Sequence, residues 1–169
     1  MDRLRLSAVS AVVAGLGLAI APASAVANST TANLSVTATV TNNCTISTSP
    51  VDFGSYDPVV ANASTNLDAT GGVTIACTKD AVTTIGLGLG GNASGSTRRM
   101  GNGTDFMTYE LYKDAPRSTV WGNSGIGLFD SGAAPSTAPR TFTVHGRVPA
   151  AQDVSAGSYA DTVVATVNF

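Results

Sequence analysis

The sequence predicts an all-β fold, a sandwich of about seven or eight short strands. Beyond the first 25 residues it is rich in Thr, Ser, Ala, Val, Gly and Asn and poor in Lys and Glu. That composition favours pleated sheet and turns over helix. No segment there keeps a helical period for ten residues, whereas short runs with apolar residues at every second position recur between turn residues.

The first 25 residues are predicted to be a secretory signal peptide. Arg3 and Arg5 precede an apolar run, residues 6–20, and small residues then allow cleavage after Ala25 or Ala27. A membrane anchor is the alternative, but a 15-residue helix rises only about 22 Å, short of the roughly 30 Å hydrocarbon core. We therefore expect an exported chain of one domain with no membrane span after cleavage.

Strands are predicted wherever the alternation is clear, and turn-rich stretches separate them. Residues 61–69 indicate a polar loop, and residues 122–139, dominated by Gly, Ser, Ala and Pro, indicate a long surface loop. Trp121 borders that loop and is the aromatic residue least committed to the core. The segments with strand-like patterns, from which the seven or eight strands would come, are residues 34–41, 45–46, 51–54, 73–77, 82–89, 98–100, 107–112, 119–121, 141–148 and 157–169.

The first and last of these strands resemble each other and carry the main functional signal. Residues 34–41 and 157–169 both alternate like edge strands, and the second runs to the terminal residue. An apolar edge strand that ends on the chain's own carboxylate favours pairing with another chain. The pattern therefore indicates assembly rather than catalysis. The alternating apolar residues are Leu34, Val36, Ala38 and Val40 in the first strand, and Val163, Ala165, Val167 and Phe169 in the last.

Cys44 and Cys77 are the two cysteines of the chain. In an exported protein a pair of cysteines is most simply a disulfide, which would close a loop of about 34 residues and stabilise the fold by roughly 3–4 kcal/mol. Two cysteines and the single histidine, His145, cannot fill a structural zinc shell. We therefore predict a disulfide and no metal site.

Composition and motifs argue against a nucleic-acid partner, a cofactor and an enzyme. Loss of the first 25 residues leaves seven basic and ten acidic residues, a net charge of −3, with no basic block beyond Arg98-Arg99. A formal G-x-G-x-x-G at residues 86–91 is followed by 92–96, which cannot start the helix that a dinucleotide site needs. His145 lies in a predicted strand, and no serine lies in a G-x-S-x-G elbow.

Five segments of the chain resemble the spore coat protein U family, which overlaps the pilins of archaic chaperone–usher fimbriae. Their order along the chain, the two cysteines and the terminal Phe169 belong to the resemblance. The resemblance covers the whole chain after the signal peptide. The segments that carry it are Thr39–Thr45, Val51–Pro58, Gly72–Cys77, Tyr109–Asp114 and Gly157–Phe169.

The resemblance implies an immunoglobulin-like β-sandwich that lacks its last strand and is completed by donor-strand exchange. A periplasmic chaperone would lend a strand first, and the N-terminal segment of the next copy would then replace it, giving a linear head-to-tail homopolymer. An outer-membrane usher is the other implied partner. The implied donor strand is Leu34, Val36, Ala38 and Val40, and the implied chaperone and acceptor strand is Tyr159, Val163, Ala165, Val167 and Phe169. The run 34–41 is alternatively the first body strand, with the donor at residues 29–34.

The expected organisation is therefore a signal peptide (1–25), an N-terminal donor extension (26–43) and a pilin-like domain (44–169). The expected function is that of a structural subunit of a surface fimbria, supporting adhesion or biofilm. Two alternatives remain open. One is a spore or cell-surface coat protein of the same family, and the other is a secreted glycan-binding sandwich that uses the 122–139 loop.

Overall fold

The computed structural model describes residues 26–169, so the predicted signal peptide lies outside the described residues. The chain divides after Ala38 into two units, which are described separately. Residues 26–43 form no regular secondary structure, and the side chains of residues 26–38 are exposed. All the strands lie in the second unit. No helix among residues 26–169 is long and apolar enough to span a membrane.

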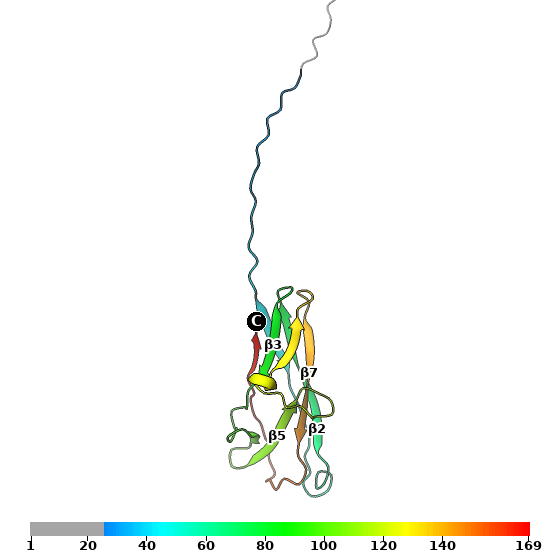
Figure 1. Cartoon of the computed structure of the whole chain (residues 1–169). Helices are drawn as coiled ribbons and strands as arrows, with labels where there is room; N and C mark the ends of the chain where they lie inside the picture. Colours follow the sequence, from blue (N-terminus) through cyan, green and yellow to red (C-terminus); the bar gives the residue numbers. More distant parts are fainter. Residues whose placement is uncertain (1–25) are drawn as a thin grey trace, which may run out of the picture. The chain divides into compact units, whose positions relative to one another are not determined.

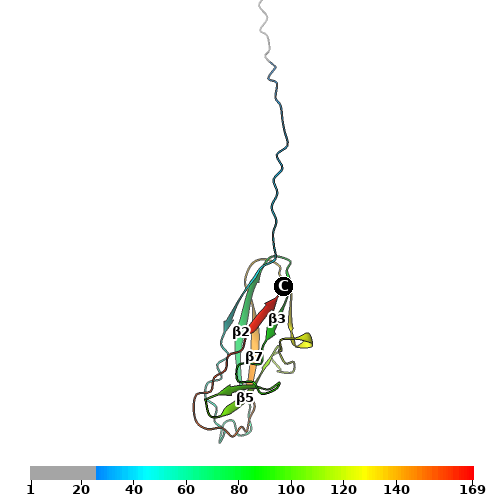
Figure 2. The same ribbon diagram turned by 90° about the vertical axis from the view of Figure 1, so that its left-hand side faces the viewer.

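The second unit is a β-sandwich of two antiparallel sheets (Figures 1 and 2). One sheet has the order β1-β2-β7-β5-β4 and the other the order β6-β3-β8. The all-β prediction is therefore confirmed. The elements are β1 (Cys44–Ser49), β2 (Leu67–Cys77), β3 (Val82–Leu87), β4 (Arg98–Gly101), β5 (Phe106–Tyr112), η1 (Gly125–Gly127), β6 (Phe129–Ala133), β7 (Arg140–Val148) and β8 (Ala165–Asn168).

The core lies between the two sheets and is formed by alternate residues of their strands, as the period-two pattern predicts. Trp121 is its largest fully buried side chain. The indole nitrogen donates a hydrogen bond of 2.9 Å to the Ile85 carbonyl, and the ring stacks on Phe129 at 4.7 Å. The expectation that Trp121 is uncommitted to the core is therefore wrong. The other core members include Val73, Ile75, Ile85, Leu87, Tyr109, Leu111, Val144 and Val148.

Arg98, in β4, is also fully buried and joins segments that are far apart in the sequence. Its guanidinium pairs with the Glu110 carboxylate. It also donates to the carbonyls of Leu87, Gly88 and Trp121 at 2.7–2.9 Å. A buried guanidinium needs such partners to compensate its lost hydration. These bonds hold the end of β3 and the backbone of Trp121 against β4.

The prediction of a long loop at residues 122–139 is wrong, because these residues contain η1 and the strand β6. Backbone pairing with β3 creates that strand, with Val82 opposite Ala133 and a register shift at Thr83/Thr84. Gly132 adopts a positive φ of 65°, which its missing Cβ allows. The small side chains that indicated a loop therefore form a strand, because pairing with a neighbour outweighs propensity.

Four predicted strands are absent or much shorter than predicted, and the predicted strand at residues 82–89 ends two residues early, at Leu87. Residues 34–41 and 51–54 form no strand. Residues 119–121 make a single bridge, from Val120 to Tyr112. The long C-terminal strand is reduced to β8 and one bridge, between Ala160 and Gly101. A strand requires a hydrogen-bonded neighbour, and the segments at residues 51–54 and 161–164 border the groove described below.

The chain enters the sandwich and terminates at the same end. Cys44 lies opposite Cys77, and Asn168 lies opposite Thr84, while a four-residue turn joins β2 to β3. Figures 1 and 2 show the end of β8 close to the start of β1. Both strands are edges, because each pairs on one side only among the described strands.

Candidate functional site: an open groove between the sheets

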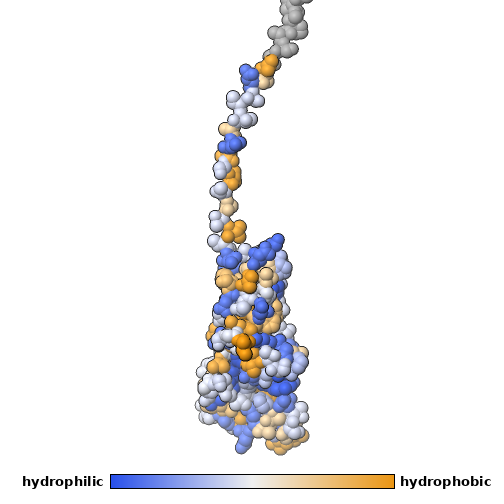
Figure 3. All heavy atoms as spheres, viewed as in Figure 1, coloured by the Kyte–Doolittle hydropathy of each residue, from blue (hydrophilic) through white to orange (hydrophobic). Residues whose placement is uncertain are grey.

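A long groove lies between the two edge strands and the segments that continue them. One wall is β1 and the residues after it, to Pro58, and the other runs from Val154 to Ala165. Two overlapping cavities of about 520 and 610 Å³ make up the groove, which is continuous because both are lined by Val51, Asp52, Phe53, Met100 and Tyr159. Figure 3 shows the apolar and polar surface of one side of the molecule.

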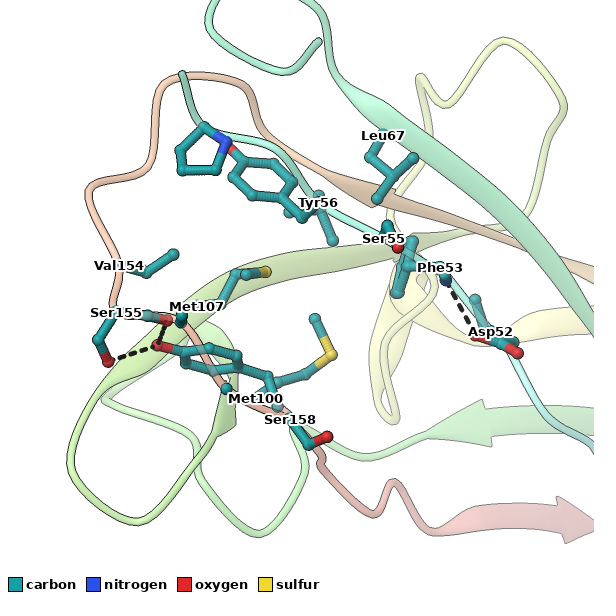
Figure 4. A pocket seen from close by; sticks show the side chains of 17 residues that line it. Asp52, Phe53, Ser55, Tyr56, Leu67, Met100, Met107, Val154, Ser155 and Ser158 are labelled. Carbon is teal, nitrogen blue, oxygen red and sulfur yellow. Dashed lines mark hydrogen bonds between the residues drawn. The ribbon is translucent and has the colours of Figure 1, made fainter. Parts of the chain in front are cut away.

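The floor of the groove is formed by apolar residues of the core and its border. In the half near β8 the floor side chains come from both sheets, with Val73, Leu111 and Val144 from one and Leu87 from the other. In the other half, Figure 4 shows Tyr56, Met100, Met107 and Val154 around one space. These floor side chains are themselves buried, with Val73, Leu111, Val144 and Leu87 only 1–5% exposed. The apolar surface that an added strand would cover belongs to half-buried residues of the two walls, among them Val51, Phe53, Tyr159 and Val163.

The β1-side wall lies directly over two glycines. A Cβ on Gly146 would approach Phe53 Cζ and Val51 Cγ1 to 2.7 Å. A Cβ on Gly71 would approach Val51 Cγ2 to 2.7 Å and the carbonyl oxygens of Ser49 and Pro50 to 2.8 Å. These glycines let residues 49–53 lie close against β2 and β7, with Val51 and Phe53 directed inward.

The Cys44–Cys77 disulfide ties the start of this wall to the sheet, which confirms the predicted pairing. The residues just before it are also fixed. The Thr78 hydroxyl accepts a hydrogen bond of 3.0 Å from the Asn43 amide and donates to the Thr41 carbonyl at 3.2 Å. The chain therefore leaves the sandwich from a defined position.

The C-terminal wall alternates between half-buried and exposed residues from Tyr159 to Val167. Its backbone is held from behind by the Gly88 amide, which donates to the Val164 carbonyl at 2.9 Å, and by the bridge at Ala160. The opposite edge of β8 has no partner strand in the described structure. A strand laid in the groove could therefore pair with this edge.

Hydrogen bonds of two tyrosines fix the residues around the far end of the groove. The Tyr56 hydroxyl donates to the Pro149 carbonyl at 2.9 Å and accepts from the Gln152 amide at 3.0 Å. Tyr159 donates to the Ser155 carbonyl at 2.8 Å. The amide of Ser155 donates to Asp105 and lowers the pKa of that carboxyl below its usual value.

Only part of the predicted acceptor strand lines the groove. Tyr159, Val163 and Ala165 do so. Val167 is half-buried in β8 beyond the cavities, and Phe169 is 56% exposed. The predicted donor residues Leu34, Val36 and Val40 are 82–87% exposed, and Ala38 is exposed too. Sequence reasoning missed the β1-side wall, of which the only signal was the alternation of Val51 and Phe53.

Within residues 26–169, no three His, Cys, Asp or Glu side chains lie close enough together to hold a metal ion. His145 lies in β7, opposite Thr70 and Tyr112 in the sheet. The groove lining contains two carboxylates, Asp52 and Asp161, and no lysine, arginine or histidine. The groove therefore suits an uncharged segment better than an anionic ligand.

Comparison with known proteins agrees with this geometry. The model of the Spore Coat Protein U domain matches residues 30–166. The chain belongs to this family. It is also 42% identical to Protein U of Myxococcus xanthus, over 96% of this chain and 97% of that protein. The resemblance identified in the sequence is thereby confirmed.

A solved structure relates the fold to pilus subunits. The chain is similar to a chain of the CsuC–CsuE chaperone–tip adhesion subunit pre-assembly complex from the archaic chaperone–usher Csu pili of Acinetobacter baumannii. The TM-score is 0.56 at 25% identity, covering 78% of this chain and 41% of that one. This chain therefore spans less than half of its structural relative. Its family and fold are those of structural pilus or coat subunits rather than enzymes.

Proposed function

We propose that this protein is a structural subunit of a surface fimbria assembled by donor-strand exchange. Residues 1–25 are the signal peptide, residues 26–43 the donor extension and residues 44–169 the acceptor domain. The exported chain passes through the periplasm to the cell surface, where the fimbria supports adhesion or biofilm. The observation that carries the proposal is the open apolar groove beside the unpaired edge of β8.

The donor extension has the residue pattern that such a groove accepts. Leu34, Val36, Ala38 and Val40 alternate with polar residues, and the described residues 26–43 carry no charged side chain. A strand added to an edge gains backbone hydrogen bonds, while alternate side chains enter pockets. Leu34, Val36 and Val40 are exposed, and burying each fully would contribute about 1.5–3 kcal/mol.

The two possible directions of the donor strand lead to different assemblies. The extension leaves its own sandwich at the end where β8 terminates. A donor parallel to β8 would return to that same end of the acceptor, which allows two copies to exchange extensions and close as a dimer. An antiparallel donor leaves at the far end, so the contact repeats without closing and gives a fibre. The proposed function therefore requires the antiparallel direction.

A periplasmic chaperone would occupy the groove before assembly, and an outer-membrane usher would exchange it for the donor of the next copy. The support for the chaperone is the similarity to a chain from a chaperone–subunit complex. An exposed apolar groove must be covered during export, because it promotes aggregation otherwise. In this scheme the inward residues Tyr159, Val163 and Ala165, with Val167 and Phe169 beyond them, contact first the chaperone and then the donor.

The proposal is tested by thermal unfolding of two disulfide-intact versions of the protein. One begins at Thr41, and the other adds residues 28–42 after Phe169 through a short flexible linker. An antiparallel donor begins where β8 ends, so a short linker suffices. We expect a much higher melting temperature for the second version. The matched control carries Leu34→Asp and Val36→Asp in the added copy, since buried charges cannot be accommodated in the groove.

Equal and high melting temperatures for all three versions would refute the proposal. They would mean that the sandwich is complete without a donor, and a secreted glycan-binding module would then be the better description. A coat protein on a spore or cell surface is the second candidate, favoured by the name of the family. Electron microscopy of the assembled protein distinguishes the two, because a fimbria gives thin fibres and a coat gives layers.

A further inference from the structure

Asp161 is exceptional in the C-terminal wall of the groove. From Tyr159 to Val167 the half-buried positions alternate with exposed ones, and the other half-buried residues are apolar or aromatic. Asp161 occupies an inward position in the middle of this series and lines the groove. A carboxylate at such a position costs free energy unless it is hydrogen-bonded.

Its carboxylate is fully engaged. Oδ1 accepts hydrogen bonds from the backbone amides of Gly91 and Asn92 at 2.8 and 3.1 Å, and from the Asn92 side-chain amide at 3.3 Å. Oδ2 accepts a bond of 2.6 Å from the Tyr109 hydroxyl. Burial and this bond raise the pKa of Tyr109, so the phenol stays protonated and keeps donating at neutral pH.

The partners come from both sheets. Tyr109 lies in β5 of the five-stranded sheet, while Gly91 and Asn92 follow β3 of the three-stranded sheet. Gly90 approaches so closely that a Cβ there would lie 1.8 Å from Oδ2. Asp161 therefore connects the C-terminal wall to both sheets, beside the cavity near β8.

We propose that Asp161 is a positioning residue that holds the groove open for an incoming strand. An unoccupied apolar groove is favoured to collapse, because closing it removes apolar surface from water. Moving the wall inward would break four hydrogen bonds to a charged acceptor, which are stronger than neutral ones. The wall is thus pre-organised, and the incoming strand need not reopen the sandwich. This inference rests on the proposed function.

The test measures how fast a donor peptide enters the groove. The protein is the exported full chain carrying Leu34→Asp and Val36→Asp, which disable its own extension as a donor. The probe is a fluorescein-labelled peptide of residues 28–42, followed by stopped-flow anisotropy. Asp161→Leu, Asp161→Asn and Tyr109→Phe are compared with the parent. Thr166→Ala is the matched control, because Thr166 is exposed in β8 and lines neither cavity.

We expect Asp161→Leu to slow association about tenfold or more, the effect typical of losing a hydrogen bond to a charged group. Asp161→Asn should be intermediate, because its carboxamide oxygen still accepts from Gly91 and Asn92. Dissociation should change little, since the bound peptide itself then fills the groove. A purely structural role would leave association of the folded protein unchanged and lower the melting temperature with and without peptide.

Each result decides the inference. Equal association rates in the parent and in the Asp161 and Tyr109 variants would overturn it and leave the proposed function intact. Weakening that arises only from faster dissociation would also overturn it. Absence of binding by the parent would overturn the proposed function, and the role of Asp161 with it. Should Asp161→Leu fail to fold, Tyr109→Phe decides the question, because it removes one hydroxyl without removing packing.

Discussion

Alanine substitutions at Gly71 and Gly146 test whether residues 49–53 lie against the sheet as one wall of the groove. Carbon atoms in contact prefer separations of about 3.5–4.0 Å. A Cβ on Gly146 would approach Val51 and Phe53 to 2.7 Å, so those side chains must move by about 1 Å. At Gly71 the obstacle includes two carbonyl oxygens at 2.8 Å, and the backbone of the wall itself must shift.

The expected magnitude is the balance of two effects. Alanine in a strand is favoured over glycine by about 0.5–1 kcal/mol, whereas overpacking costs about 1–3 kcal/mol. We therefore expect Gly146→Ala to lower the free energy of unfolding by about 1 kcal/mol and Gly71→Ala by about 2 kcal/mol. For a domain of this size, 1 kcal/mol corresponds to a fall of about 4 °C in melting temperature.

The assay is thermal and urea unfolding of the version with residues 28–42 added after Phe169. Gly88→Ala is the control, because the nearest atom to its Cβ, the Val164 carbonyl oxygen, lies at an ordinary 3.5 Å. In the peptide-binding assay described above, we also expect Gly146→Ala to slow peptide entry, since it displaces Phe53, which lines the groove. Unchanged or raised melting temperatures for both variants would show that residues 49–53 do not pack closely against Gly71 and Gly146.

Three further substitutions test the interior, the surface charges and the exit of the chain. Arg98→Met should lower the free energy of unfolding by about 3–5 kcal/mol in urea titrations, because it leaves Glu110 and three carbonyls without their partner; a loss below 1 kcal/mol would contradict its role. A hydrogen bond from Arg147 lowers the pKa of Asp68 in the folded protein. The pair therefore stabilises the fold at pH values above the ordinary carboxyl pKa, and this stabilisation is lost as the pH falls through the lowered pKa of the folded state. Asp68→Asn should therefore cost less than about 1 kcal/mol at pH 7 and progressively less as pH falls below the ordinary carboxyl value, and a cost that does not change with pH would argue against the pair. Thr78→Val should speed hydrogen exchange of the Asn43 amide, and unchanged exchange would show that the hydroxyl does not fix the exit of the chain.

The sequence predicts well those strands whose pattern is enforced by burial on one face. In β2, β5 and β7 the alternation places Ile75, Leu111 and Val144 in the core, and the structure follows it. The Cys44–Cys77 pair was predictable for a different reason: an exported chain with two cysteines leaves one pairing. The first signal is local, because alternation extends over a few neighbouring residues, and the second is the number of cysteines in the chain.

The unpredicted features depend on partners that are distant in the sequence. Arg98 lies in a dipeptide of arginines that indicates surface charge, yet its burial depends on Glu110 and on carbonyls from two other segments. Asp161 interrupts an apolar series for a reason visible only once Tyr109 and Gly91 lie beside it. Strand β6 exists because β3 offers it an edge, although its small residues indicate a loop.

The segment at residues 34–41 differs from these, because its pattern predicts a strand and it forms none. Its apolar side chains at every second position are exposed, and Figure 3 shows apolar residues separated by polar ones along it. Alternation of this kind has value only where one face is buried. The sandwich shows the converse, an unpaired strand edge beside a groove whose walls carry half-buried apolar residues. A segment patterned as a strand and a groove beside a free strand edge are the two parts that the proposed pairing between copies requires.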